Sequence, residues 1–231
     1  MMPTKRTRCV AVAPFAIILS ACGDGGCPAV EPPELPPERQ ALLDPESPAF
    51  DETAPDSFRV RLETTRGDVV IRITRAWSPL GADRFYNLVR NGFFDDAAFF
   101  RVIPGFVAQF GMHGVPAVNE AWIDQTLEDE PVVVPNARMT LTYAQAGPAT
   151  RTTQLFINYR DNSETLDAQG FAPIGSVVEG SDVLFRLHGD YGDFPPAGEG
   201  PDPGCMMQGG NRYLERDFER LDYIRTATVE S

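Results

Sequence analysis

Short segments of alternating apolar and polar residues follow one another from residue 57 onwards. Residues 58–64 place an apolar side chain at every second position, and a turn at Arg66-Gly67-Asp68 leads into a second apolar run over 69–73. A period of two is typical of a strand with one buried face, so these runs predict a hairpin. Similar runs predict further strands over residues 99–103, 106–109, 138–143, 154–158, 171–178 and 221–229.

Two helices are predicted between these strands. Ser78-Pro79 is a typical helix start, and apolar side chains then recur at helical spacing from Ala82 to the stop signal Asn91-Gly92. The second helix is predicted over residues 182–187. One or two helical turns are expected over residues 212–220.

Three segments lack such periodicity. Residues 118–130 and 144–153 are expected to be loops, and the Gly- and Pro-rich residues 189–210 a surface excursion. Many strands without a regular alternation of strand and helix favour an antiparallel barrel or sandwich, with a Phe-rich core.

The first 22 residues have the layout of a secretory signal: a basic start, an apolar run over 9–19, and then Leu19-Ser20-Ala21-Cys22. That ending resembles the lipobox of bacterial lipoproteins, which implies cleavage after residue 21 and acylation of Cys22. The alternative is an ordinary signal peptide with a chance cysteine. Several acyl chains on one cysteine would give stable membrane anchoring. We therefore expect a protein of the bacterial cell envelope, lipid-anchored through Cys22, with its domain in the periplasm or at the cell surface.

Residues 22–56 are rich in Pro and Glu, and include a Glu31-to-Glu38 run with four prolines. Such a composition buries little apolar surface and favours extended polyproline structure, so this segment is predicted to be a tether. The predicted organisation is a signal peptide over 1–21, a tether over 22–56 and a folded domain over 57–231.

The chain is acidic, with a net charge of −13. Its basic start carries three cations and no acid, so cleavage would leave a charge of −16. A surface of this kind repels nucleic acid and anionic lipid, so we expect no nucleic-acid partner.

Conventional catalytic motifs are missing from the sequence. His113 and His188 have no partners at ligand spacing, so no metal site is predicted. Neither a G-x-S-x-G elbow nor a Gly-rich phosphate loop occurs. Cys27 and Cys205 remain after the leader cysteines are set aside, and in a secreted protein they could pair or stay apart.

Arg101 lies among four apolar residues, Phe99, Phe100, Ile103 and Phe106. From the pattern alone, the favoured interpretation is an arginine on the polar face of a strand, with its stem over apolar atoms. The other interpretation is a guanidinium at the rim of an apolar pocket, with Gln109 as a hydrogen-bonding neighbour.

Three motifs in order resemble the cyclophilin family. Residues 99–109 are similar to its first signature, with Arg101, Phe106 and Gln109 in place; residues 143–157 match its second without a gap; Leu166-Asp167 and the spacing of Gly175 and Gly180 supply a third. The resemblance covers residues 58–188 and the closing strand. It implies a mainly β fold, a closed eight-stranded antiparallel β-barrel capped by two α-helices, and peptidyl-prolyl cis-trans isomerase activity without a cofactor.

The resemblance also implies roles for individual residues. Arg101 would be the catalytic donor, and Gln109 would hold Arg101 and the substrate backbone. The proline cup would be formed by Phe106, Val107, Phe156 and Leu166, and the peptide groove by Ala144, Gln145 and Phe171. The implied partners are proline-containing polypeptides, bound by a monomer.

Five positions depart from the family pattern. Phe100 replaces a His, Val107 a Met and Phe110 a Gly. Thr165 stands where eukaryotic members have a Trp that contacts cyclosporin, so weak cyclosporin binding is expected. Phe171 is offset by one residue from a groove-lining His. None of these removes Arg101, but a catalytically weak module that binds Pro-containing peptides or a protein partner stays an alternative.

Overall fold

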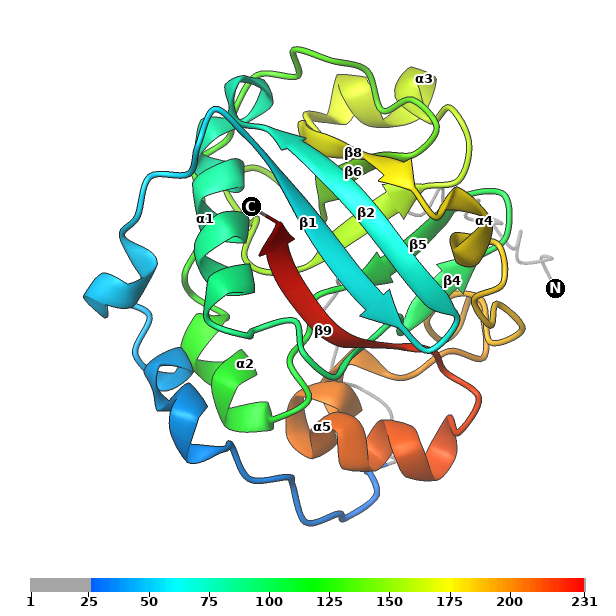
Figure 1. Ribbon diagram of the computed structural model, residues 1–231. Coiled ribbons are helices and arrows are strands. Elements are labelled where there is room, and N and C mark those ends of the chain that lie inside the picture. Colours follow the sequence, from blue (N-terminus) through cyan, green and yellow to red (C-terminus); the bar gives the residue numbers. More distant parts are fainter. Residues whose placement is uncertain (1–25, 231) are drawn as a thin grey trace, which may run out of the picture.

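Nine antiparallel strands form a single curled sheet in the computed structural model, which describes residues 26–230 (Figure 1). The strands are β1 (Ser57–Thr64), β2 (Gly67–Thr74), β3 (Ala97–Ala98), β4 (Arg101–Ile103), β5 (Val107–Phe110), β6 (Thr140–Tyr143), β7 (Leu155–Asn158), β8 (Pro173–Glu179) and β9 (Tyr223–Glu230). All of them lie in segments that were predicted to be strands or directly next to one. The prediction of a mainly β, antiparallel fold is therefore confirmed.

The sheet is not the closed eight-stranded barrel that was expected. Its order is β3-β9-β1-β2-β8-β6-β7-β5-β4, and no described ladder joins the outer strands β3 and β4. These two strands are consecutive in the chain, separated only by Phe99 and Phe100. The Phe99 N–H donates to the carbonyl of Asp222 at 2.8 Å, so the chain stays with β9 until it crosses to the other edge. The backbone itself thus links the edges of an open, half-barrel sheet.

The helices cover the sides and one end of this sheet. α1 (Pro79–Arg90) lies along one side, and α2 (Pro116–Trp122) and α5 (Pro203–Asp217) lie together beneath it (Figure 1). Two shorter helices, α3 (Ser163–Leu166) and α4 (Ser181–Leu184), flank β8. The 3-10 helices are η1 (Pro37–Leu43), η2 (Pro48–Phe50), η3 (Arg75–Trp77) and η4 (Asp167–Gln169). α2 extends over the first residues of the segment 118–130 that was expected to be a loop, because Val118 and Trp122 bury an apolar face there.

The predicted helix start at Ser78 is correct in position but not in mechanism. The Ser78 side chain makes no capping bond. The carboxylate of Glu130 accepts the N–H groups of Leu80 at 2.7 Å and Gly81 at 3.1 Å, and so caps α1 from 50 residues away in the sequence. A negative charge at this end also suits the helix dipole.

The main core is rich in Phe, as expected. Buried residues of the strands, of α1 and of the segments between them form one cluster, which includes six phenylalanines: Phe58, Phe85, Phe93, Phe94, Phe99 and Phe110. Phe94 lies at the centre, with its ring 5.3 Å from that of Phe85 and 5.8 Å from that of Phe110.

The described part of the predicted tether, residues 26–56, is packed against the domain instead of extending from it. Leu42 is fully buried in the main core, and the Trp122 indole N–H donates to its carbonyl at 2.8 Å. Arg39 pairs with Asp95, and the Ala54 N–H donates to Asp83. A few apolar residues among many prolines are thus enough to bind this segment to the sheet and helices.

The predicted excursion over residues 189–210 is also more ordered than expected. It leads into α5, whose buried residues build a second core around Phe100 together with Met112 and Leu221. Cys205 in α5 forms a disulfide with Cys27, so the amino-terminal segment and α5 are covalently joined. Gly210 kinks α5 with a φ of 53°, and a Cβ there would lie 2.0 Å from the Gly114 carbonyl oxygen, so only glycine fits.

Two neighbouring leucines test whether residues 26–56 belong to the folded unit. Leu42→Ala should lower the free energy of unfolding by about 2–5 kcal/mol, because it opens a cavity in the main core. Leu43→Ala should change it by less than about 0.5 kcal/mol, since Leu43 is exposed. Urea unfolding followed by Trp fluorescence measures both. Equal, small effects would mean that the segment is a free tether.

Candidate functional site

Four side chains from four neighbouring strands form a row on the face of the sheet opposite the main core. Arg101 on β4 is paired with Gln109 on β5, Gln109 with Phe156 on β7, and Phe156 with Thr142 on β6. Their neighbours within the strands, such as Val102, Ala108 and Ile157, lie in the main core. The period-two alternation of short strands thus places the predicted donor, its predicted support and a predicted cup residue side by side.

The guanidinium of Arg101 is held by two side chains. Its Nη1 donates to Gln109 Oε1 at 3.0 Å, and Gln109 in turn donates from Nε2 to Gln154 Oε1 at 3.0 Å. On another edge, Nε and Nη2 donate to the two carboxylate oxygens of Asp193 at 2.6 and 3.1 Å. Arg101 is only 8% exposed, so the interpretation as a surface arginine, which the pattern alone favoured, is wrong.

Asp193 was not singled out in the sequence. Burial opposes its ionisation, but the hydrogen bonds and the charge of Arg101 outweigh burial and, with the Phe194 N–H, hold its pKa below the usual range. The carboxylate is therefore ionised at neutral pH, opposite a permanent cation. The Phe194 ring lies beside the same guanidinium, with its centroid 5.4 Å from Cζ.

Six predicted cup and groove residues form one apolar cluster, separate from the main core. Its members come from β5, β7, α3 and the segments next to them: Phe106, Val107, Ala144, Phe156, Leu166 and Phe171. Phe156 and Phe171 meet edge to face, with ring centroids 5.8 Å apart. We call this set the apolar cluster.

The loop over residues 144–153 forms a wall beside the apolar cluster. Gln145 donates from Nε2 to the carbonyl of Gln169 at 2.9 Å, which ties the loop to the end of η4. At the other end of the loop Arg151 is 1% exposed, and its Nη1 donates to Glu130 Oε2 at 3.1 Å. Since Glu130 also caps α1, one buried ion pair fixes both the wall and the helix.

Three buried asparagines, Asn136, Asn158 and Asn162, form a hydrogen-bond network beside the apolar cluster. None of them was predicted from the sequence. Asn136 donates from Nδ2 to the carbonyl of Phe171 at 2.7 Å. Asn162 donates to Asn158 Oδ1 at 2.7 Å and to the carbonyl of Phe106 at 3.2 Å, and its own carbonyl accepts the Leu166 N–H at 2.9 Å. The network thus fixes the backbone of three cluster residues. The only signal in the sequence was the amide-rich stretch after β7, which reads equally well as a turn.

Residues 59–194, more than half of the chain, match the family described as "Cyclophilin type peptidyl-prolyl cis-trans isomerase/CLD". The chain belongs to the cyclophilin family. The predicted enzyme class, a cyclophilin-type peptidyl-prolyl cis-trans isomerase, is thereby confirmed.

Individual relatives agree with this assignment. A peptidyl-prolyl cis-trans isomerase of Acinetobacter baylyi is 31% identical over 55% of this cyclophilin and 70% of its own length. Isomerase B of Escherichia coli is 32% identical over 56% of this chain and 84% of its own. The crystal structure of a Cryptosporidium parvum cyclophilin-type isomerase has a TM-score of 0.57 and 19% identity, and covers 76% of this chain and 98% of that chain. At this identity the last likeness concerns the fold alone.

The site of this cyclophilin combines a planar cationic donor with an adjacent apolar surface. Rotation about an X-Pro bond makes and breaks no covalent bond, so neither a nucleophile nor a general base is needed. Within residues 26–230, one grouping of metal-ligand residue types occurs, Cys27 with Asp202 and Cys205. Its two sulfurs are joined to each other, and Asp202 accepts the Cys205 N–H at 3.0 Å as the cap of α5, so all three have structural roles.

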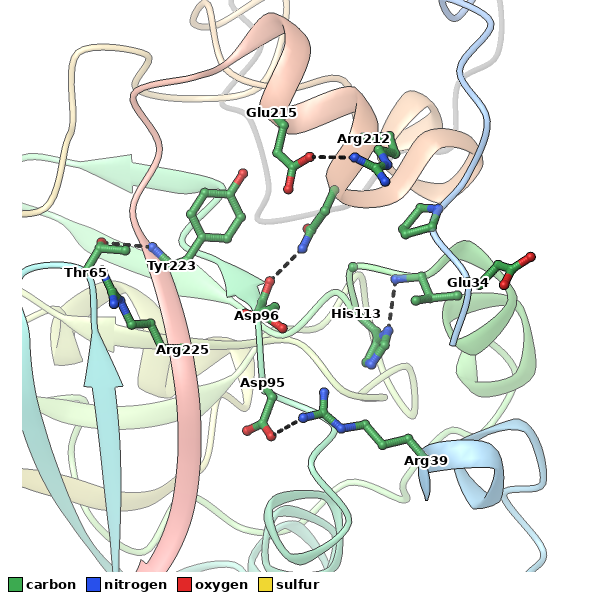
Figure 2. Close-up of a pocket in the computed structure, with 14 residues that line it drawn as sticks. Glu34, Arg39, Thr65, Asp95, Asp96, His113, Arg212, Glu215, Tyr223 and Arg225 are labelled. Carbon is green, nitrogen blue, oxygen red and sulfur yellow. Dashed lines mark hydrogen bonds and ion pairs between the residues drawn. The ribbon is translucent and has the colours of Figure 1, made fainter. Parts of the chain in front are cut away.

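A cavity of about 650 Å³ lies away from the Arg101 row (Figure 2). Arg39 and Asp95 lie on one side of it, and Arg212 and Glu215 of α5 on the other. His113 lines the cavity and is buried; its Nδ1 accepts the Val115 N–H at 2.9 Å, which leaves the proton of the neutral ring on Nε2. Burial and the nearby charge of Arg39 lower the pKa of His113 to about 4.

This lowered pKa predicts that stability depends on His113 in mildly acidic solution. The unfolded ring has a pKa near 6.5, so protons bind the unfolded chain more tightly. The contribution of His113 is fully present above about pH 6.5 and is lost as the pH falls towards 4. Between pH 7 and 5 the loss should be about 2 kcal/mol.

Urea unfolding of the wild type and His113→Gln at pH 7 and pH 5 measures this loss. The variant should lose less stability than the wild type over that interval, because Gln does not titrate. Parallel losses in both proteins would contradict the assignment. Carboxyl groups titrate equally in the two proteins, so their contribution cancels in the comparison.

Proposed function

We propose that this cyclophilin isomerises X-Pro bonds in exported polypeptides, and thereby assists their folding, while it is held at the bacterial cell envelope by lipidated Cys22. We propose further that it acts as a monomer on proline-containing chains. Cys22 lies outside the described residues, so its lipidation rests on the Leu-Ser-Ala-Cys sequence. Among residues 26–230, the structure contains no helix with the length and apolar character needed to cross a bilayer. The disulfide between Cys27 and Cys205 supports an oxidising compartment.

The observation that supports the catalytic assignment is the row of Arg101, Gln109 and Phe156. An X-Pro bond prefers trans by only about 0.5–1 kcal/mol, but its rotation barrier is roughly 18–20 kcal/mol because of amide resonance. In the twisted amide the nitrogen regains its lone pair and accepts a hydrogen bond. We assign that donation to Arg101, which favours the transition state over both ground states.

The remaining site residues have supporting roles in this proposal. The apolar cluster holds the proline ring, with Phe106, Val107, Phe156 and Leu166 as the cup. Ala144 and Phe171 of the cluster line the peptide groove, together with Gln145 outside it. Gln109 orients Arg101 and the substrate backbone. One related structure, of the Cryptosporidium parvum cyclophilin, was determined in the presence of the dipeptide Ala-Pro, which is consistent with binding of proline-containing peptides in this family.

Loss of the Arg101 guanidinium should reduce isomerisation strongly. Arg101→Ala should lower kcat/KM well over tenfold, because the only cation in the row disappears. Arg101→Lys should recover little of this, since an ammonium lacks the planar fork. A protease-coupled assay on a short X-Pro peptide, with the full chain, measures the rates.

The exposed Arg72 on β2 provides a matched control, and Arg72→Ala should leave the rate unchanged. If Arg101→Ala were as active as the wild type, the catalytic assignment would be wrong. If the folded wild type did not accelerate isomerisation at all, the alternative of a catalytically weak peptide-binding module would be favoured.

The proposed anchor makes a prediction about the leader cysteines. In a bacterial host, Cys22→Ser should abolish labelling by radioactive palmitate and release the protein from the membrane fraction. Cys9→Ser, which changes the other leader cysteine, should leave both unchanged. A wild-type protein that is not labelled by palmitate and is not found in the membrane fraction would exclude lipid anchoring at this residue and favour the ordinary signal peptide.

A further inference from the structure

The ion pair between Arg101 and Asp193 connects the segment over 189–202 to the catalytic row. The two carboxylate oxygens of Asp193 accept from Nε and Nη2, while Gln109 accepts from Nη1. We infer that Asp193 is a positioning residue for isomerisation, which acts by holding the Arg101 guanidinium in the orientation that the reaction needs. This inference rests on the proposed role of Arg101 as the donor.

The Asp193 carboxylate contacts two nitrogens of the Arg101 guanidinium, and we call this contact the clamp. A guanidinium has five N–H groups in one plane, and a carboxylate that bridges Nε and one terminal nitrogen fixes that plane from the side. Gln109 adds a third contact on the remaining nitrogen. Together the two partners fix both the plane and the rotation of the group.

Asp193 itself is held firmly by its surroundings. One of its oxygens also accepts the Phe194 N–H at 2.7 Å, and its carbonyl accepts the Gly200 N–H at 2.9 Å. A Cβ on Gly198 or Gly200 would lie 2.4 or 2.7 Å from that carbonyl oxygen, so the loop closes on Asp193 only because these two residues are glycines. The clamp is thus part of a tight turn.

The second core fixes this turn to the rest of the protein. The Phe194 ring stacks on Phe100, with centroids 5.9 Å apart and planes 17° apart. Phe100 stands at the position where the family signature has His, directly before Arg101. α5 follows the turn and carries Cys205, which is bonded to Cys27. Phe100 therefore packs against the segment over 189–217.

These contacts favour positioning over inhibition. A carboxylate that competed with substrate would have to leave Arg101 in each cycle, yet Asp193 is tied to a closed turn, a stacked ring pair and a covalently joined helix. An interaction that persists through the reaction can increase the rate by limiting the donor to productive orientations. The ion pair also partly compensates the largely buried charge of Arg101.

The test compares two isosteric substitutions in the same segment. Asp193→Asn keeps the shape of the side chain but replaces one accepting oxygen by a donor that repels the guanidinium. Its kcat and kcat/KM should both fall about tenfold, with KM nearly unchanged, because orientation matters in the transition state. Asp190→Asn, which removes an exposed ion pair with Arg220, should leave both constants as in the wild type.

A second measurement follows the guanidinium without using activity. In ¹H–¹⁵N spectra of the full chain, the Arg101 Nε–H should exchange slowly with water in the wild type and Asp190→Asn, and rapidly in Asp193→Asn. Thermal unfolding of each variant shows whether its fold is intact. A merely structural role would lower the unfolding temperature and the active fraction, without the change in exchange at Arg101 in the folded protein.

The outcomes separate this inference from the proposed function. If the wild type and Asp193→Asn are equally active, or if Asp193→Asn is more active, Asp193 is not a positioning residue, and a gain would indicate an inhibitory contact. If Arg101→Ala is as active as the wild type, the role of Arg101 fails, and the inference about Asp193 fails with it. A tenfold loss with faster Nε–H exchange supports both.

Discussion

A guanidinium that is 8% exposed must have its charge compensated inside the protein, because removing a cation from water without a partner costs several kcal/mol. In this cyclophilin the compensation comes from Asp193, more than 90 residues later in the sequence, and from Gln109 across the strand pair. Arg101 can therefore stay in the row only if the segment over 189–202 and strand β5 are both in place. The position of the Arg101 guanidinium thus depends on contacts from segments that are distant in the sequence.

This requirement gives the segments outside the sheet a role in the site. The turn around Asp193 is attached to a second core, that core contains α5, and α5 is joined through Cys205 to the amino-terminal segment. Residues 26–56 pack onto the main core through Leu42. A second buried ion pair, between Arg151 and Glu130, fixes the groove wall to the start of α1 in the same way. Buried Arg101 thus connects one loop to the sheet, and buried Arg151 connects another to α1.

The sequence allowed the strands, the main helix and the composition of the apolar cluster to be predicted, because these depend on local periodicity and on short motifs. Arg101, Gln109 and Phe156 come together through strand register, which alternation determines. The closing geometry of the sheet, the packing of Leu42 and the asparagine network depend on contacts between distant segments, and no local pattern encodes them. Asp193 was hidden for the same reason: an acid in a Gly- and Pro-rich stretch is usually solvated, and only the fold shows what it faces.

The pairing of Arg101, the proposed catalytic cation, with a carboxylate is compatible with the chemistry of amide rotation. The twisted amide differs from the planar one mainly in the lone pair on nitrogen, which is a directional, dipolar change with no net charge. Such a change is stabilised by a donor that points correctly, and the magnitude of the donor's charge matters less than its direction. Partial neutralisation of Arg101 by Asp193 therefore costs little in the transition state, while a fixed plane of N–H groups is retained. A reaction that developed a full anion would not tolerate the same arrangement, since a carboxylate beside the donor would repel it.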